Sequence, residues 1–354
     1  MESVRDSSWA IPPLDHAAAD RAAARQDKLT KPRGSLGRLE AIPVQLAAIQ
    51  GTELPRARPA GVILFAADHP VCRHGVSAYP TEVTAAMVRN FVAGGAAASV
   101  MARSIDVPLH VVDVGVAHPY GEVQGASAQM FVDPVSGDPE GDIRVEDALT
   151  EESLSRAVAA GRNAVDRLPS ETTVLLLGEM GIGNTTLASA MACALLDRDP
   201  TEMVGRGTGI DDPALANKRT VVADAVARLH DRAPRTVLRA LGGREIAALY
   251  GAAGRACERG MAIVVDGFIV STALFALVRS VPEVSPRLIF AHHSRETGHR
   301  AVLEALDAQP LLELSMALGE ASGALAAFSL VEHACRLHAE MATFDEAGVP
   351  DKEP

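Results

Sequence analysis

Five strongly apolar runs of eight residues recur between positions 61 and 294 of the chain. They are GVILFAAD (61–68), LHVVDVGV (109–116), TTVLLLGE (172–179), GMAIVVDG (260–267) and RLIFAHHS (287–294). Each run is hydrophobic almost without interruption, which is typical of strands in a parallel sheet that is covered on both faces. Alanine-rich stretches of helical character separate them, for example 81–104, 151–167, 185–197, 214–230 and 268–279. This alternation predicts an α/β fold with an open, doubly wound and mainly parallel sheet.

Both ends of the chain are predicted to be helical. The segment LDHAAADRAAARQDKLTKP (14–32) is expected to form a helix that stops before its proline, and GSLGRLEAIPVQLAAIQG (34–51) repeats apolar residues near helical spacing. The chain after position 295 is expected to be mostly helical again. We therefore expect a large α/β domain over residues 61–295 and a small helical domain built from residues 1–60 and 296–354.

Composition narrows the classes of function. The chain has 354 residues, and its 45 acidic against 33 basic residues give a formal charge of −12. An acidic chain lacks the basic face that a phosphate backbone requires, so nucleic acid is not expected as a partner. No basic-then-apolar leader is present and the apolar runs are short or interrupted by charge, so no membrane span is expected.

The four cysteines are scattered without a C-x-x-C pair. We expect neither a disulfide framework nor a zinc site, and we expect a cytoplasmic protein. No acidic cluster requires a metal ion, so the sequence predicts no metal and no cofactor.

Polar residues end all five predicted strands. They are Asp68-His69, Asp113, Gly178-Glu179, Asp266-Gly267 and His292-His293-Ser294. One such residue would be explained as a helix cap. Because ligands of doubly wound sheets bind beyond the carboxyl ends of the strands, the five together predict a polar crevice at that edge.

A glycine-rich loop, LLLGEMGIGNTT (175–186), follows the third run. Its glycines permit positive φ and close approach of the backbone, and its Asn184, Thr185 and Thr186 can cap the next helix. The N–H groups at such a helix start suit a phosphate. The loop is neither a Walker A motif nor a G-x-G-x-x-G dinucleotide motif, and a simple tight turn is the alternative.

A second glycine run, VGRGTGIDDPALANKR (204–219), precedes a helix that carries Lys218. Asp212 is the expected N-cap and Pro213 the first-turn residue. Two glycine loops and a lysine suggest a phosphate held by backbone dipoles and one point charge. The alternative for Lys218 is a solvated helix face.

A single acid, Glu320, lies among small residues in LLELSMALGEASGALAAFSLVEHA (311–334). Partial desolvation would raise its pKa and make it a usable base near neutral pH. The alternative is a glutamate that is favoured by the dipole at a helix N-terminus.

Taken together, these segments resemble the nicotinate-nucleotide:dimethylbenzimidazole phosphoribosyltransferase family. The matching segments include KPRGSLGRLE, FAADHPVCRHGVSAYPTEV, LLLGEMGIGNTT, VGRGTGIDDPALANKR, LGGREIAALYGAA, VVDGFIVSTAL, AHHSRETGHR and LGEASGA, in the family's order. The resemblance covers most of the chain from 31 to 335. It implies a Rossmann-like large domain, a small helical domain, a homodimer, and transfer of phosphoribose from nicotinate mononucleotide to 5,6-dimethylbenzimidazole during cobalamin nucleotide-loop assembly.

The resemblance also implies roles for individual residues. Glu320 is the expected general base, and Glu179 is hypothesised to face the sugar or the reacting base, where positive charge develops. The residues expected to hold the phosphoribosyl group are Gly178, Met180, Gly181, Gly183, Asn184, Thr185, Gly205, Gly207, Thr208, Gly209, Lys218, Asp266 and Ser294. Those expected around the flat base are Asp68, His69, Ser77, Tyr79, Met316 and Leu318.

The chain departs from the family pattern at several positions. Pro70 and Ala321 stand in place of usual glycines, Ala86 in place of a common glutamine, and Arg295 is an addition. Residues 121–148, rich in Gly, Pro, Asp and Ser, lack a family motif and are expected to be a surface excursion. These departures keep open a different base, and also a catalytically altered paralogue that binds a nucleotide or aromatic base as a sensor.

Overall fold

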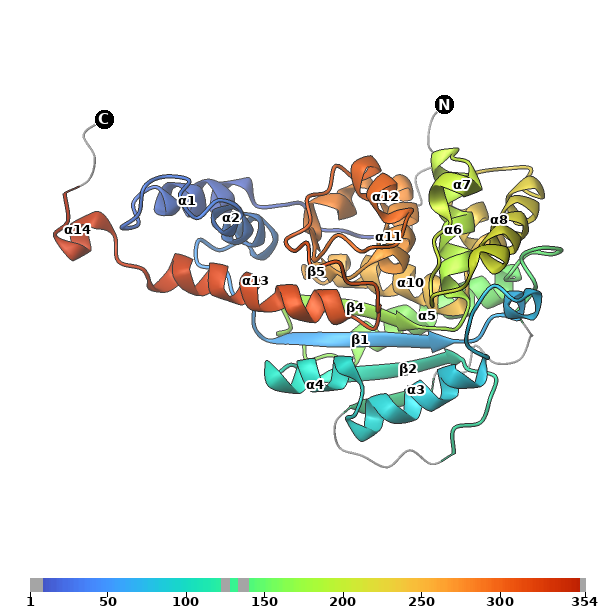
Figure 1. Ribbon diagram of the computed structural model, residues 1–354. Helices are drawn as coiled ribbons and strands as arrows, with labels where there is room; N and C mark the ends of the chain where they lie inside the picture. The colour runs from blue at the N-terminus through green and yellow to red at the C-terminus, as the bar shows by residue number, and fades with distance from the viewer. Residues whose placement is uncertain (1–8, 122–127, 133–139, 351–354) are drawn as a thin grey trace.

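The computed structural model describes residues 9–121, 128–132 and 140–350. Six parallel strands form one sheet in the order β3-β2-β1-β4-β5-β6 (Figure 1). Their bounds are β1 Ala60–Ala67, β2 Leu109–Gly115, β3 Gln129–Val132, β4 Val174–Met180, β5 Ala262–Val265 and β6 Leu288–Phe290. This order confirms the prediction of a doubly wound parallel sheet, and it reverses between β1 and β4.

Helices cover both faces of the sheet, as the apolar strands require. The helices before β5 are α1 His16–Gln26, α2 Arg38–Gln50, α3 Glu82–Ala93, α4 Ala97–Ser104, α5 Glu151–Asp166, α6 Asn184–Leu196, α7 Pro200–Met203, α8 Asp212–Ala227, α9 Pro234–Leu241 and α10 Arg244–Glu258, with the 3-10 turn η1 Pro70–His74. Those after it are α11 Phe268–Ser280, α12 His299–Ala305, α13 Ser322–Glu340 and α14 Phe344–Ala347, with the 3-10 turn η2 Pro282–Arg287.

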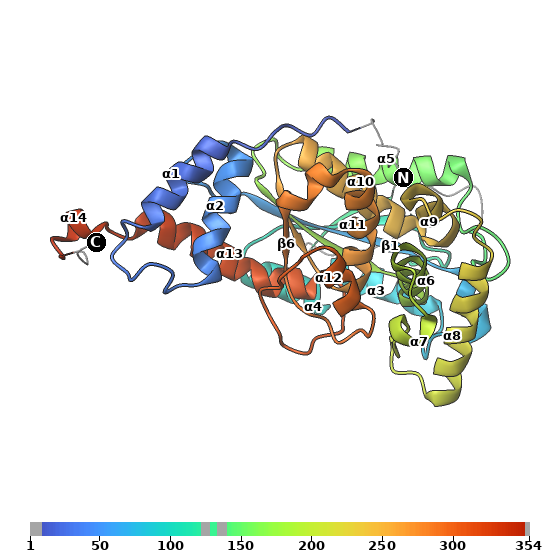
Figure 2. The same cartoon turned by 90° about the horizontal axis from the view of Figure 1, so that it is seen from above.

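Alternate residues of each strand supply two separate cores. Ile63 and Phe65 of β1 point into a core shared with α5 and α10, whereas Val62 and Leu64 point into one shared with α3, α4 and α13. All eight residues of β1 are buried. Figure 2 shows α5 and α10 on one side of the strands and α4 and α13 on the other. Burial on both faces explains why the strands lack polar alternation.

The structure differs from the expected elements in several places. Part of the 121–148 segment forms the parallel edge strand β3, which pairs with β2, so the segment is not only a surface excursion; residues 122–127 and 133–139 lie outside the described residues. The pair α9 and α10 was not expected from the sequence. The fifth apolar run leaves the sheet after Phe290.

The 81–104 stretch is helical as predicted and forms two helices. By length and composition alone, residues 82–104 are apolar enough to cross a membrane. Gly94, at a φ of +90°, ends α3, and α4 begins three residues later. The buried side chains of both helices pack in the core next to β1 and β2.

Helices from the two ends of the chain meet beside the sheet. Arg25 of α1 donates to the carbonyl of His338 in α13 at 2.8 Å, and Gln26 contacts the His338 ring at 2.9 Å. In contrast, α12 packs on α11, and residues 306–321 contain no helix, so the chain after 295 is less helical than expected. The division into a 61–295 domain and a terminal helical domain remains a prediction.

Candidate active site

A cavity opens at the carboxyl end of β4, next to the segments that follow β5 and β6. Its volume is about 570 Å³, which suits a small molecule. The predicted site residues that line it are Tyr79, Glu179, Met180, Gly181, Asn184, Thr185, Gly207, Thr208, Ser294, Leu318 and Glu320. The predicted crevice therefore exists, and it gathers residues from both glycine loops and from the segment before α13.

Ten predicted site residues are not among those that line this cavity. They are Asp68, His69, Ser77, Gly178, Gly183, Gly205, Gly209, Lys218, Asp266 and Met316. Three of them contact lining residues: Lys218 donates to Thr185, Ser77 contacts Thr208, and His69 lies next to Gly181. Gly178 packs against Ala321, because a Cβ on it would lie 2.5 Å from the Ala321 nitrogen.

Glu179, near the end of β4, is 5% exposed and lines the cavity. Asn184 donates a hydrogen bond to its Oε2. Burial, together with the negative charges of Asp266 and Glu245, raises the pKa of Glu179 to about 8, against the lowering effect of Asn184. The carboxyl group is thus largely protonated at pH 7 unless a cation lies beside it.

The first two residues of α6, Asn184 and Thr185, line the cavity. Gly183, at a φ of +95°, occupies the N-cap position without a side-chain cap, so Asn184, Thr185 and Thr186 do not cap this helix as predicted. The Asn184 side chain donates its hydrogen bond to Glu179 instead. An uncapped helix start beside a cavity suits an anion.

Lys218 is buried behind the two glycine loops, and the alternative of a solvated helix face is wrong. Its ammonium donates to Thr185 Oγ1 at 2.8 Å, and only 1% of the residue is exposed. Burial lowers its pKa to about 8, partly offset by Glu296. Gly207, at a φ of +50°, passes so close that a Cβ would lie 3.1 Å from the Lys218 nitrogen. The N-cap of α8 is Asp211, one residue before the predicted Asp212.

Glu320 lies in a turn of unusual backbone conformation. Gly319, Glu320 and Ala321 all have positive φ, at +81°, +61° and +59°. Two consecutive non-glycine residues in this region store backbone strain, which is common at functional sites. Glu320 is 6% exposed, and its Oε2 has no hydrogen-bond partner among the described residues. Burial first, and the charge of Asp266 second, raise its pKa to about 7.

Asp266 holds this turn in place. Its Oδ1 accepts a hydrogen bond from the backbone N–H of Ala324 at 2.9 Å, at the start of α13. Gly323 lies so close that a Cβ would be 2.0 Å from the His292 ring and 2.8 Å from Asp266 Oδ1. The predicted ligand residue Asp266 therefore anchors the helix that follows Glu320.

The histidines after β6 form a buried layer beside the cavity. Ser294 donates its backbone N–H to His299 Nδ1 at 2.9 Å, so the His299 Nε2–H points to Ser271 Oγ at 3.0 Å. Burial, with further repulsion from His292, lowers the pKa of His299 to about 3. His299 is a neutral structural group that fixes the backbone at Ser294.

The remaining strand-end and base-pocket residues are directed elsewhere. Asp113 accepts from the Tyr120 hydroxyl at 2.7 Å, and Asp68 accepts from a backbone N–H at 2.8 Å. His69 is fully buried between Glu140 and Glu245. None of these three residues lines the cavity.

Sequence reasoning missed several residues that line the cavity. One face of α3 contributes Val83, Met87 and Asn90, four and seven residues apart, and helical spacing could have revealed this face. Ala86 is not among the lining residues. His292, one of the polar strand-end residues named from the sequence, lines it as well, and so do Gly95, Glu296 and Phe268, which were not predicted as site residues.

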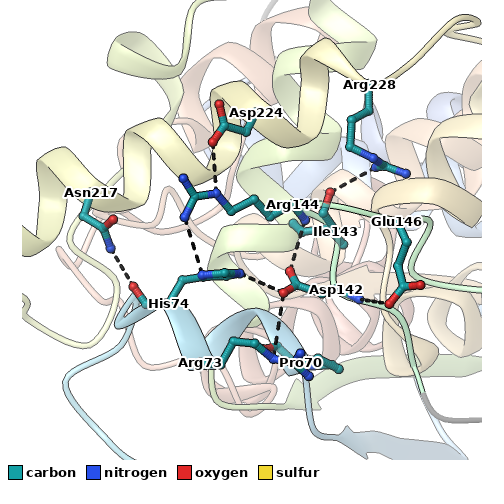
Figure 3. A network of polar contacts seen from close by, with 10 residues as sticks. All are labelled: Pro70, Arg73, His74, Asp142, Ile143, Arg144, Glu146, Asn217, Asp224 and Arg228. Carbon is teal, nitrogen blue, oxygen red and sulfur yellow. Dashed lines mark hydrogen bonds and ion pairs between the residues drawn. The ribbon is translucent and has the colours of Figure 1, made fainter.

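A network of polar contacts joins η1, the turn at 140–147 and α8 next to the site (Figure 3). His74 Nε2 contacts Asp142 Oδ2 at 2.7 Å, and Arg144 Nε donates to Asp224 of α8 at 2.9 Å. Asn217, the neighbour of Lys218, donates to the His74 carbonyl at 2.6 Å. The network ties the helix that carries Lys218 to the segment that follows β1.

Comparisons with known proteins agree with this geometry. The model of a family described as "Phosphoribosyltransferase" matches residues 11–349. Nicotinate-nucleotide–dimethylbenzimidazole phosphoribosyltransferase of Pseudomonas aeruginosa is 49% identical over 335 residues, 94% of each chain, and that of Xanthomonas axonopodis pv. citri is 48% identical over 332 residues. The crystal structure of CobT from Thermus thermophilus has a TM-score of 0.89 and 42% identity, and the match covers 95% of this chain and 100% of that one. The chain therefore belongs to the nicotinate-nucleotide–dimethylbenzimidazole phosphoribosyltransferase family of enzymes.

Proposed function

We propose that the chain transfers the phosphoribosyl group of nicotinate mononucleotide to 5,6-dimethylbenzimidazole, giving α-ribazole 5′-phosphate and nicotinate in cobalamin nucleotide-loop assembly. The observation that carries this proposal is the position of two buried carboxyl groups, Glu179 and Glu320, on the wall of one cavity between a glycine-loop side and an apolar side. The names of the relatives give the two substrates.

Glu320 is the general base in this proposal. It takes the N–H proton of the benzimidazole while the other ring nitrogen forms the bond to C1′ of the ribose. A pKa of about 7 suits this step, because the group is partly ionised at neutral pH and still basic enough to hold the proton. Tyr79, Leu318 and Met87 would flank the flat ring system.

The glycine-loop side would hold the donor. Lys218, the start of α6 and the backbone at Gly181 and Gly207 would bind the phosphate. As the bond from C1′ to nicotinate breaks, its electron pair stays on the pyridine nitrogen and the sugar gains positive charge. That cation would lower the pKa of Glu179, and the resulting carboxylate would stabilise charge where it develops. The leaving group needs no metal because its pyridinium is already cationic.

The test is incubation of the protein with nicotinate mononucleotide and dimethylbenzimidazole, with nicotinate and α-ribazole 5′-phosphate followed by mass. We expect both products in equal amounts. Binding of either substrate without release of nicotinate would favour the sensor alternative. A mixture of competing bases in the same assay would identify the preferred acceptor. The residues of α3 that line the cavity would help to select it.

We also propose that the protein is a cytoplasmic homodimer, in keeping with the resemblance. The four cysteines are free thiols, which fits a reducing compartment. Light scattering coupled to size-exclusion chromatography should give twice the 37.0 kDa chain mass. A mass equal to one chain would contradict the dimer.

A further inference from the structure

A buried ionic cluster lies beneath the first glycine loop, outside the cavity. His69 follows β1 directly, and its side chain has no exposed surface. Its Nδ1 contacts Glu140 Oε1 at 2.8 Å, and its Nε2 lies 3.0 Å from Glu245 Oε1, an ion pair without hydrogen-bond geometry. Arg244, at the start of α10, is close enough for its charge to act on Glu140.

The carboxyl groups of this cluster favour a protonated ring. Burial alone would lower the pKa of His69, but the adjacent Glu245 and Glu140 outweigh it and raise the pKa well above its usual value. Burial raises the pKa of Glu140 as well, against the lowering effect of His69. Removal of one partner from such a buried cluster leaves the other groups uncompensated.

The glycine loop lies directly on the His69 ring. A Cβ on Gly181 would be 2.8 Å from His69 Nε2 and 2.7 Å from the carbonyl oxygen of Ala67. A Cβ on Gly243 would be 2.4 Å from His69 Cε1. The ring is therefore in close contact with two glycines, one of which, Gly181, belongs to the loop that lines the cavity.

Glu140 begins the turn at 140–147, and other residues of this turn belong to the network of Figure 3. Asp142, two residues later, contacts His74 on η1, and η1 begins immediately after His69. Two histidine–carboxylate contacts, His69 with Glu140 and His74 with Asp142, thus join the same two segments. Only the first of them touches the glycine loop.

We propose that His69 is a positioning residue: clamped between Glu140 and Glu245, it sets the path of the Glu179–Gly183 loop and thereby the affinity for the nucleotide donor. This inference rests on the function proposed above. It assigns to His69 a role different from the base contact expected from the sequence. It also gives the turn at 140–147 a function, since this turn supplies one side of the clamp.

The test compares His69→Gln with His16→Gln in steady-state kinetics, with nicotinate mononucleotide and the base varied separately. His69→Gln is expected to raise the KM for the nucleotide about tenfold or more, the range for loss of a hydrogen bond to a charged group. The KM for the base is expected to change less than about twofold, because the loop and not the base side moves. His16→Gln makes the same substitution at an exposed histidine at the start of α1, away from the clamp and the loop, and should leave both KM values as in the wild type.

Glu245→Gln is the second variant and serves if His69→Gln does not fold. It breaks the other side of the clamp and is expected to raise the same KM selectively. Unchanged nucleotide KM in the variant that folds, or an equal rise in both KM values, would overturn the inference. Failure of the wild-type chain to release nicotinate would instead reject the proposed function, so the two failures are distinct.

Discussion

Replacement of Glu320 by glutamine should lower turnover and raise the free energy of unfolding. The gain in unfolding free energy should depend on pH. The folded protein raises the pKa of this carboxyl group from 4.5 to about 7, so it binds the proton more tightly than the unfolded chain does. Ionisation of the buried group therefore destabilises the native state as pH rises from 4.5 to 7, and the full cost is present above pH 7. At 6% exposure, solvent screens little of it.

The expected magnitude follows from the size of the pKa change. At 1.36 kcal/mol for each pH unit, ionised Glu320 costs about 3 kcal/mol of unfolding free energy. Glutamine has a similar shape and no charge to desolvate. The free energy of unfolding of Glu320→Gln should exceed that of the wild type by less than about 1 kcal/mol at pH 5 and by about 3 kcal/mol at pH 8.5.

The assay is urea denaturation followed by circular dichroism at pH 5 and pH 8.5, with turnover measured in parallel. The same variant is expected to lose ~10²–10⁴ in kcat, the usual contribution of a general base. Glu313→Gln is the control, because this carboxylate lies in the same loop with 78% of its side chain exposed. An equal stability difference between Glu320→Gln and wild type at both pH values would refute the desolvation argument, and near-normal turnover would refute the base.

Three further substitutions test the rest of the site. Lys218→Met should raise the KM for nicotinate mononucleotide about 10- to 100-fold with the KM for the base unchanged, since it removes one buried cation; steady-state kinetics would contradict this if both KM values rose together. Glu179→Gln should lower kcat about 100-fold while calorimetry still detects nucleotide binding, and a loss of affinity alone would refute a transition-state role. Gly323→Ala should lower both Tm and activity, because its Cβ would lie 2.0 Å from the His292 ring; an unchanged Tm would show that α13 shifts freely.

The local pattern of hydrophobic and polar residues was sufficient to predict most of the sheet and the edge of the sheet at which the site lies. Strands covered on both faces need apolar residues at every position, so five of the six strands are visible as apolar runs. The edge strand β3 is only half-buried, and its short, partly polar sequence carries no such signal. The glycine loop and Glu320 were visible because their residue types are unusual at those places.

Tertiary packing decided what each polar residue does. Lys218 has the sequence context of a solvated helix face, yet α8 packs it behind Thr185. His69 and Asp266 have the context of ligand residues, yet one is clamped beneath the glycine loop and the other anchors α13. Sequence determines which groups can bind or transfer a proton. Which of them reach the cavity depends on contacts between segments far apart in the chain, and no local period records those contacts.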